Sequence, residues 1–205
     1  KSELALAYQN LSEAYFSTKQ FDKALDFNIK TLLIKEQLKD RTGIISSTTI
    51  IAKLYSMRKE HRKAIEYYEK ALNLLEPANE NNSIAEILPK IGAEYLRFND
   101  FKKAGNYLLK GLKLNRRIQN KAGILESYNR LANLNFKLKK IRLAESQLDE
   151  ASKLLNQVKN DTELLEYYKL KTAIDSIKRD FKNAFRWQTR YHVLKSKIEK
   201  ENAVS

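Results

Sequence analysis

Five alanines recur along the chain at a constant spacing of 40 residues, at Ala24, Ala64, Ala104, Ala144 and Ala184. Three residues before each alanine stands Phe, His or Ile, and ten residues after it stands Ile or Leu. Self-similarity at a fixed period of this length is the signature of a repeat architecture, in which each repeat is one supersecondary unit. We therefore predict five consecutive structural repeats.

Each repeat carries the pattern of two amphipathic helices. In the first repeat, Leu4, Tyr8, Leu11 and Tyr15 follow one another at three- or four-residue spacing, which places them on one helix face. The chain has only five Gly and two Pro among 205 residues, so helix breakers are scarce. We predict an all-α fold of five helix pairs, in which the recurring alanines lie where two helix backbones approach closely.

The expected boundaries follow from the same period. The repeats should cover about residues 4–40, 44–80, 84–120, 124–160 and 164–203. Longer connections, rich in Gly, Asn, Asp and Ser, are expected between repeats near residues 39–43, 77–83, 120–123 and 160–162.

The pattern Leu88-x-x-Ile91-Gly92-x-x-Tyr95, followed by Ala104-x-x-x-Leu108, resembles the tetratricopeptide repeat. The period of 40 residues exceeds the usual length of about 34, which is similar to an extended variety whose second helix gains about a turn. This resemblance covers essentially the whole chain. It implies a right-handed α-solenoid that forms a single superhelix over residues 1–205, with a concave groove lined by the first helix of each pair.

The tail offers a second resemblance. Residues 184–200, with Trp187 and Tyr191, resemble the final repeat of bacterial sensor proteins, in which tetratricopeptide arrays precede a histidine kinase or a helix-turn-helix output. The resemblance implies that the chain is the sensor or regulatory module of a larger bacterial signalling or transcription-regulating protein.

Composition narrows the classes of function. Lys and Arg exceed Asp and Glu by 39 to 25, and the net charge of +14 attracts acidic partners. The chain has no Cys and only two His, and it lacks glycine-rich phosphate loops and nucleophile–base motifs. We therefore predict no enzyme, no metal and no cofactor. No apolar run approaches the ~20 residues of a membrane span. The sequence leaves the periplasm and the cytoplasm equally open.

Seven polar residues on the first helices stand beside the apolar face and are expected to face the groove. They are Lys53, Lys90, Arg97, Asn129, Arg130, Asn133 and Lys137. Asparagine amides four residues apart can hold a peptide backbone, because each amide both donates and accepts hydrogen bonds. The basic residues can meet carboxylates through charge-assisted hydrogen bonds. We predict that this surface binds a protein or peptide.

Other interpretations stay open. The asparagines equally fit a solvated helix surface, and Glu86–Lys90 and Glu126–Arg130 have the spacing of ion pairs that satisfy each other. The net charge also admits electrostatic binding to nucleic acid or to an anionic surface. Against this alternative, the chain has no aromatic–basic RNA motif, no recognition-helix signature and no compact polybasic run.

Overall fold

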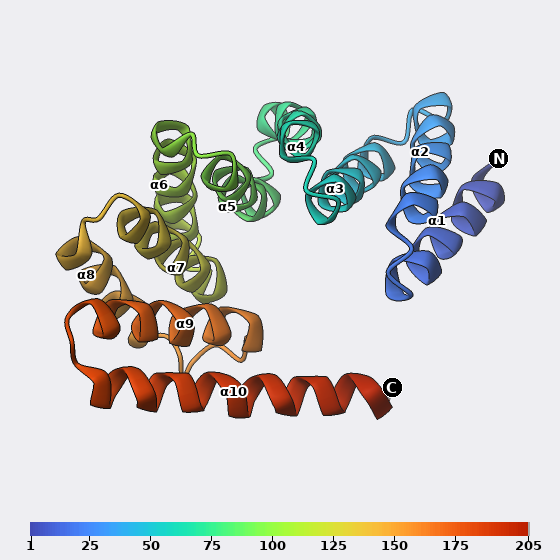
Figure 1. The fold of residues 1–205 in the computed structure, drawn as a ribbon. Helices are drawn as coiled ribbons and strands as arrows, with labels where there is room; N and C mark the ends of the chain where they lie inside the picture. The colour runs from blue at the N-terminus through green and yellow to red at the C-terminus, as the bar shows by residue number, and fades with distance from the viewer. Residues whose placement is uncertain (205) are drawn as a thin grey trace. The chain divides into compact units, whose positions relative to one another are not determined.

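The computed structural model describes the backbone of residues 1–204 and the side chains of residues 1–201. Within these residues the chain forms ten α-helices, one short 3-10 helix and no strand (Figure 1). The elements are α1 Ser2–Ser17, α2 Phe21–Gln37, α3 Arg41–Met57, α4 His61–Leu75, η1 Glu76–Ala78, α5 Asn81–Arg97, α6 Phe101–Arg117, α7 Lys121–Lys137, α8 Ile141–Ser152, α9 Asp161–Ile177 and α10 Phe181–Val204. The predicted all-α fold class is confirmed.

The helices divide into two compact bodies. The N-terminal body is Lys1–Tyr107 and the C-terminal body is Leu108–Ser205. In the N-terminal body α1 packs against α2 and α3 against α4, and α2 and α4 each also contact the first helix of the next pair. In the C-terminal body α7 packs against α8 and α9 against α10, while α9 also contacts α7 and α8. Each body thus repeats one packing scheme. The single superhelix over all residues stays a prediction.

The recurring alanines lie in the core, as the period predicts. Ala24, Ala64, Ala104 and Ala144 are 0% exposed, and Ala184 is 6% exposed. The close approach of two helices is visible in the first pair, where the buried Ser12 hydroxyl of α1 donates a hydrogen bond of 2.9 Å to the Ala24 carbonyl of α2. A larger side chain at either position would separate the two backbones.

The turns show a shorter period than the sequence pattern. Residues with a left-handed backbone, φ between 53° and 63°, stand at Lys19, Lys39, Lys59, Asn79, Asn99, Gln119, Lys139 and Arg179. Their spacing is 20 residues, and between residues 19 and 179 only position 159 breaks it. A left-handed residue just after a helix is the usual way to end it. In the first three pairs both helices have 15 to 17 residues, so the second helix is not longer by a turn there, whereas α8 has 12 residues and α10 has 24.

Two of the connections expected to be long are short. Asp40 and Asn120 are N-caps, and their side chains accept hydrogen bonds from the backbone N–H of Gly43 at 2.9 Å and of Gly123 at 3.2 Å. Because a cap lets the helix begin at once, α3 and α7 start at residues 41 and 121, about three residues before the expected boundaries. The connection expected near residues 160–162 is long and covers residues 153–160, because α8 ends early.

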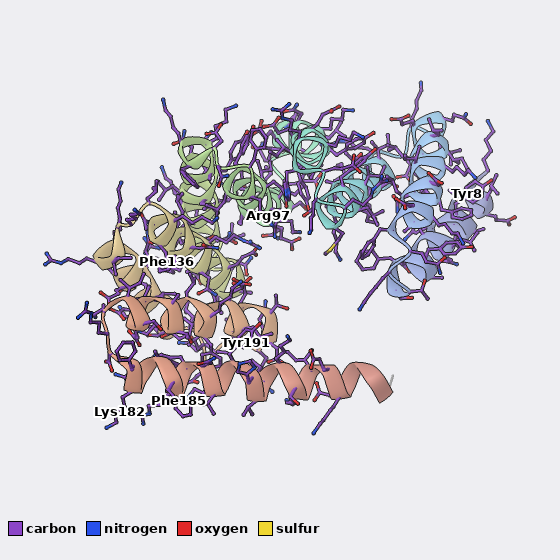
Figure 2. All side chains as sticks on the ribbon, in the orientation of Figure 1. Tyr8, Arg97, Phe136, Lys182, Phe185 and Tyr191 are labelled. Carbon is purple, nitrogen blue, oxygen red and sulfur yellow. The ribbon has the colours of Figure 1, made fainter. Side chains whose placement is uncertain are left out.

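The fifth pair is held by a polar contact that replaces an apolar one. Asp175 of α9 is 6% exposed and accepts a hydrogen bond of 2.9 Å from Nε1 of Trp187 in α10. The Trp187 ring stacks on Tyr168, with 5.8 Å between ring centroids. Asp175 is therefore buried although it is charged. Figure 2 shows Tyr191 on the side of α10 toward α9 and Phe185 on the opposite side.

Candidate functional site

In the N-terminal body, two of the predicted lysines lack an acidic partner. Lys53 of α3 is exposed, and its amino group lies 4.4 Å from the centroid of the Phe16 ring in α1. Lys90 of α5 is partly buried. Neither amino group has a carboxylate within 4.0 Å in the part of the chain that the structure describes. Both cations are thus available to a carboxylate from outside the chain.

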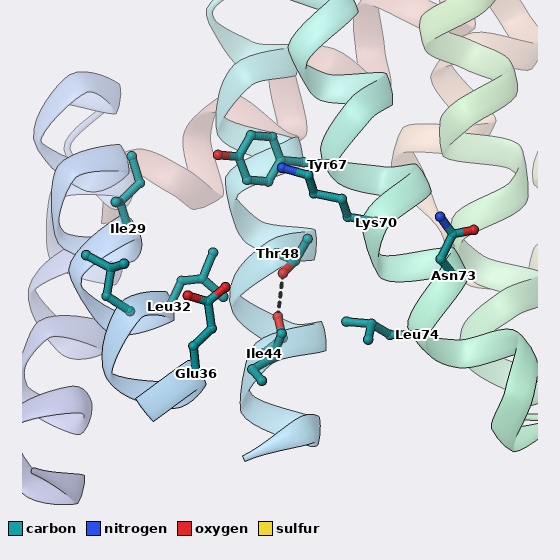
Figure 3. A pocket seen from close by; sticks show the side chains of 10 residues that line it. Ile29, Leu32, Glu36, Ile44, Thr48, Tyr67, Lys70, Asn73 and Leu74 are labelled. Atoms are coloured by element: carbon teal, nitrogen blue, oxygen red, sulfur yellow. Dashed lines mark hydrogen bonds between the residues drawn. The ribbon is translucent and has the colours of Figure 1, made fainter. Parts of the chain in front are cut away.

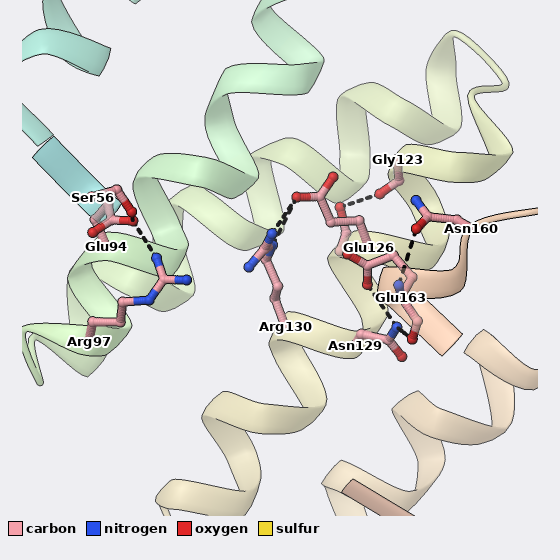
Figure 4. A network of polar contacts seen from close by, with 10 residues as sticks. Ser56, Glu94, Arg97, Gly123, Glu126, Asn129, Arg130, Asn160 and Glu163 are labelled. Carbon is pink, nitrogen blue, oxygen red and sulfur yellow. Dashed lines mark hydrogen bonds and ion pairs between the residues drawn. The ribbon is translucent and has the colours of Figure 1, made fainter. Parts of the chain in front are cut away.

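Arg97 belongs to a polar network centred on Glu94, which is only 2% exposed (Figure 4). The Glu94 carboxylate accepts a hydrogen bond of 2.7 Å from the Ser56 hydroxyl of α3 and pairs at 2.7 Å with Nδ1 of His61 in α4. Arg97, one turn further along α5, donates to the same carboxylate. The side chain of Arg97 is 49% exposed, so its outer edge can still meet a partner.

His61 and Glu94 were not among the predicted site residues, although the sequence carries a signal for them. The equivalent positions in the other repeats hold Phe or Ile in place of His61, and Ala, Leu or Ile in place of Glu94. A polar residue at two apolar positions of the same repeat pattern indicates that the two contact each other. We interpret the network as a structural tie between α3, α4 and α5.

In the C-terminal body, Asn129 is buried between α7 and α9 and does not lie on the expected groove surface. Its side chain is 2% exposed, and its amide nitrogen donates to the backbone carbonyl of Glu163 at 2.9 Å and to the Glu163 carboxylate at 2.8 Å. Asn129 is therefore occupied in joining α7 to α9, and it is neither solvated nor turned toward a ligand. Its Oδ1 atom is buried and has no hydrogen-bond partner among the described residues.

Arg130 lies beside this contact and is held by Glu126, one turn earlier on α7. Its Nε and Nη2 atoms donate to Oε1 of Glu126 at 2.9 and 2.7 Å. Burial opposes the charge of Arg130, but the carboxylates of Glu126 and Glu163 outweigh it and raise the pKa of the guanidinium. Burial likewise raises the pKa of the Glu163 carboxyl, and the charge of Arg130 and the Asn129 hydrogen bond offset only part of that rise.

The remaining predicted residues of α7 stay accessible. Asn133 is partly exposed and Lys137 is exposed. Of the two ion pairs that the spacing suggested, Glu126–Arg130 forms, whereas no contact within 4.0 Å joins Glu86 to Lys90 in the described residues. Lys90 and Arg97 occupy the same two repeat positions as Arg130 and Lys137, so two successive repeats present cations in the same register.

A pocket in the N-terminal body was not predicted. It has a volume of about 620 Å³ and lies between α2 and α4, with α3 beneath (Figure 3). Its lining is mainly apolar, with Glu36 and Lys70 as charged members, and comprises Ile29, Leu32, Leu33, Glu36, Ile44, Thr48, Tyr67, Lys70, Asn73 and Leu74. Leu33 gave the one available signal, because it is apolar and 54% exposed where the next repeats carry Asn73, Lys113 and Lys153.

Two other classes of site have no candidate among the described residues. They contain no group of three or more His, Cys, Asp or Glu side chains arranged to hold a metal ion. Within the same residues, no helix is both long enough and apolar enough to cross a bilayer.

Comparison with known sequences identifies one family model, described as the tetratricopeptide repeat, which matches residues 3–77. No curated protein matches the chain. The family match covers the first two helix pairs, where the core of Ala24, Leu25, Ile51 and Leu54 lies.

Solved structures share the fold at low sequence identity. BtubC (BKLC) from P. vanneervenii matches with a TM-score of 0.76 and 18% identity, over 94% of this chain and 80% of that one. The nearly identical TPR-like repeats of a Podosopora anserina protein assigned as a kinesin light chain match with a TM-score of 0.72 and 13% identity, over 95% of both chains. The Rap conjugation gene regulator of the plasmid pLS20, solved with a Phr peptide, matches with a TM-score of 0.81 and 15% identity, over 94% of this chain and 53% of that one.

Proposed function

We propose that this tetratricopeptide-repeat chain is a scaffold that binds a protein or peptide through the first helices of its pairs. One observation carries the proposal. Lys90 and Lys137 are cations on first helices that no carboxylate of the described chain neutralises, and the exposed part of Arg97 lies near Lys90 in sequence on the same helix. Basic residues in such positions favour a partner with an acidic segment or a free C-terminal carboxylate.

In the C-terminal body, the first helix α7 can hold the backbone of a peptide at Asn133. Its amide is partly exposed, unlike that of Asn129, and so it can donate to and accept from an extended chain. Arg130 takes a supporting part, because a ligand carboxylate would have to compete with Glu126 for its guanidinium. The buried contact between Asn129 and Glu163 fixes α7 against α9 and thereby holds Arg130 and Asn133 in place.

Similar structures support the class of ligand through the fold alone. The Rap regulator of pLS20 was solved with a peptide, and this chain spans about half of that protein. We further propose that the chain serves as the sensor or regulatory part of a larger bacterial signalling or transcription-regulating protein. The tail resemblance and the regulatory name of that structural neighbour support this context.

A peptide selection followed by calorimetry tests the proposal. Random peptides displayed on phage would be selected on the chain, and acidic or C-terminally anchored sequences should be enriched. Calorimetry with a selected peptide should show at least a tenfold loss of affinity for Lys90→Ala, since a charge-assisted hydrogen bond contributes about 1.5–3 kcal/mol. The loss for Arg130→Ala should be smaller, because Glu126 already holds that guanidinium. Lys113→Ala removes an exposed lysine from the second helix α6 and is the matched control.

Two outcomes would reject the first-helix surface. The first is unchanged affinity in a combined Lys90→Ala, Arg130→Ala and Asn133→Ala variant. The second is loss of binding only in Leu33→Glu, which would place the partner in the pocket between α2 and α4. A mixed-sequence DNA duplex at physiological salt tests the electrostatic alternative. DNA binding that weakens steeply with salt, and whose affinity is the same in each single variant as in the unchanged chain, would favour that alternative.

A further inference from the structure

The outer face of α10 exposes two large aromatic side chains. Phe181 and Phe185 are 67% and 70% exposed. They occupy the repeat positions that Phe21 and Leu25 occupy in α2. Leu25 is only 4% exposed, because it packs with Ile51 and Leu54 of the following helix α3, and Phe21 packs against the same cluster. The two phenylalanines thus stand where the first helix of a next repeat would cover them.

Contacts in other repeats agree with this assignment. Glu145 of α8 occupies the position of Phe185, and its carboxylate meets the Lys178 amino group at 2.5 Å, just after α9. His61 of α4 occupies the position of Phe181 and contacts Glu94 of α5. In each case the side chain reaches toward the first helix of the following pair.

The opposite half of this contact is exposed on α1. Leu11 is 40% exposed, whereas the equivalent Ile51, Ile91 and Leu131 are 0%, 0% and 3% exposed. Leu4, two turns earlier on the same face, is 48% exposed. These residues have the pattern of a first helix that packs on a preceding second helix. The chain therefore carries both halves of a repeat-to-repeat contact, and neither half is covered within it.

We propose that α1 of one copy docks on α10 of a second copy, in the register that α3 takes on α2. Phe185 would then meet Leu11 and Ala14, which occupy the positions of Ile51 and Leu54. In the contact between α2 and α3, Leu25 packs with Leu54. At the equivalent positions of the proposed contact, the larger Phe185 ring faces the smaller Ala14. This exchange of size keeps the contact filled.

Charge favours the same occupant. Helix α1 contains Glu3 and Glu13 and no Lys or Arg, whereas α10 contains six Lys or Arg and two Glu. The proposed register also places one residue of each sign face to face. A Cβ atom built on Gly43 would lie 2.6 Å from Cδ of Lys35, so the third position of a first helix lies against this position of the preceding second helix. In the docked copies these positions hold Glu3 and Lys195.

Docking of this kind is heterologous, since different surfaces of the two copies meet. A pair joined by one contact leaves one α1 face and one α10 face uncovered, so further copies can add to it. A single helix-to-helix contact is small, and we therefore expect association at high protein concentration. This inference is independent of the peptide-binding proposal, because it uses other residues.

Sedimentation velocity of the 205-residue chain over a range of concentrations tests the inference. The weight-average mass should rise above the 23.9 kDa of one chain, and Leu11→Asp or Phe185→Asp should each abolish the rise. Both side chains are exposed, so neither change should unfold the chain, and circular dichroism confirms this. A mixture of the two variants should form dimers and nothing larger, because only one intact contact can form between them.

A charge reversal gives a second and independent measurement. Lys195→Glu should weaken association, and combination with Glu3→Lys should restore it. Lys197→Glu is the matched control on α10, since Lys197 is 63% exposed and two residues away. A wild-type chain that stays monomeric at every concentration overturns the inference. Association that survives in both aspartate variants, or in Leu11→Asp alone, also overturns it, the latter by showing that α1 takes no part.

Discussion

The polar network around Glu94 can be converted into an apolar contact that the same chain uses elsewhere. His61 and Glu94 occupy the repeat positions of Phe21 and Leu54, which lie in one apolar cluster between α2 and α3. We therefore expect the combined variant His61→Phe, Glu94→Leu to be far more stable than the two single variants suggest. Replacing a buried polar pair by apolar residues of similar size is often neutral, whereas removing one partner is costly.

The size of each single effect follows from the contacts that are lost. His61→Phe removes one of three donors from a carboxylate that is only 2% exposed. Glu94→Leu leaves the partly buried Ser56 hydroxyl and His61 ring without their acceptor. A buried group that loses its partner costs about 1–3 kcal/mol, so each single change should destabilise by that amount. For a chain of this size the melting temperature should fall by roughly 2–12 °C.

Urea unfolding followed by circular dichroism measures the coupling. The double variant should be at least about 1 kcal/mol more stable than the sum of the single changes predicts, which is the range for residues in contact. Glu86→Leu on the exposed side of α5 is the control and should change stability by no more than about 0.5 kcal/mol. Additive single effects, equal to the double effect within about 0.5 kcal/mol, would refute the idea that the two positions form one exchangeable contact.

Four further outcomes are expected. Ala104→Leu at a site that is 0% exposed should destabilise by about 1–3 kcal/mol through overpacking, whereas the same change at the exposed Ala7 should not, by thermal unfolding. Lys59→Gly should stabilise by up to about 1 kcal/mol in urea unfolding, because φ of 62° strains a side chain and suits glycine. Trp187→Phe should cost about 1–3 kcal/mol in the same assay, because Asp175 loses its donor. Because the pKa of Glu163 is raised, the folded chain binds a proton at this residue more readily than the unfolded chain does. The contribution of Glu163 to stability should therefore fall as pH rises from about 4.5, the unperturbed value, through the raised pKa. Glu163→Gln should remove this pH dependence from a series of unfolding measurements.

Much of the fold was predictable because core packing repeats with the sequence. The alanines at 40-residue spacing are buried in all five pairs, where only a small side chain fits the close-packed core. Helix ends were harder to place. Lys, Asn, Gln and Arg hold the left-handed turn positions, where glycine would have given a visible signal, so the 20-residue period of the turns is hidden in the sequence.

The candidate site was predicted only in part, since exposure depends on contacts between repeats. The spacing of Asn129 and Asn133 correctly puts both amides on α7, but it cannot show that Glu163 of the next pair buries one of them. Likewise the spacing of Glu86 and Lys90 is the same as that of Glu126 and Arg130, yet only the second pair forms in the described chain. The pocket beside Leu33 arises from three helices, and no local pattern specifies it.

The polar residues at core positions have a consequence for how repeats find their neighbours. Apolar contacts between pairs resemble one another closely, so a chain of such repeats could pair helices out of order. Glu94 fits beside His61 and Ser56, whereas a slipped pairing that set it against Phe21 would bury a carboxylate without donors, at a cost of several kcal/mol by desolvation. Asp175 with Trp187, and Asn129 with Glu163, impose the same condition on the C-terminal body. The faces of α1 and α10 that we expect to dock carry no such buried polar pair, so the selectivity of their docking rests on exposed charges such as Glu3 and Lys195. Salt screens exposed charges, so this selectivity should weaken as the salt concentration rises. The order in which the repeats pack within one chain should not change with salt.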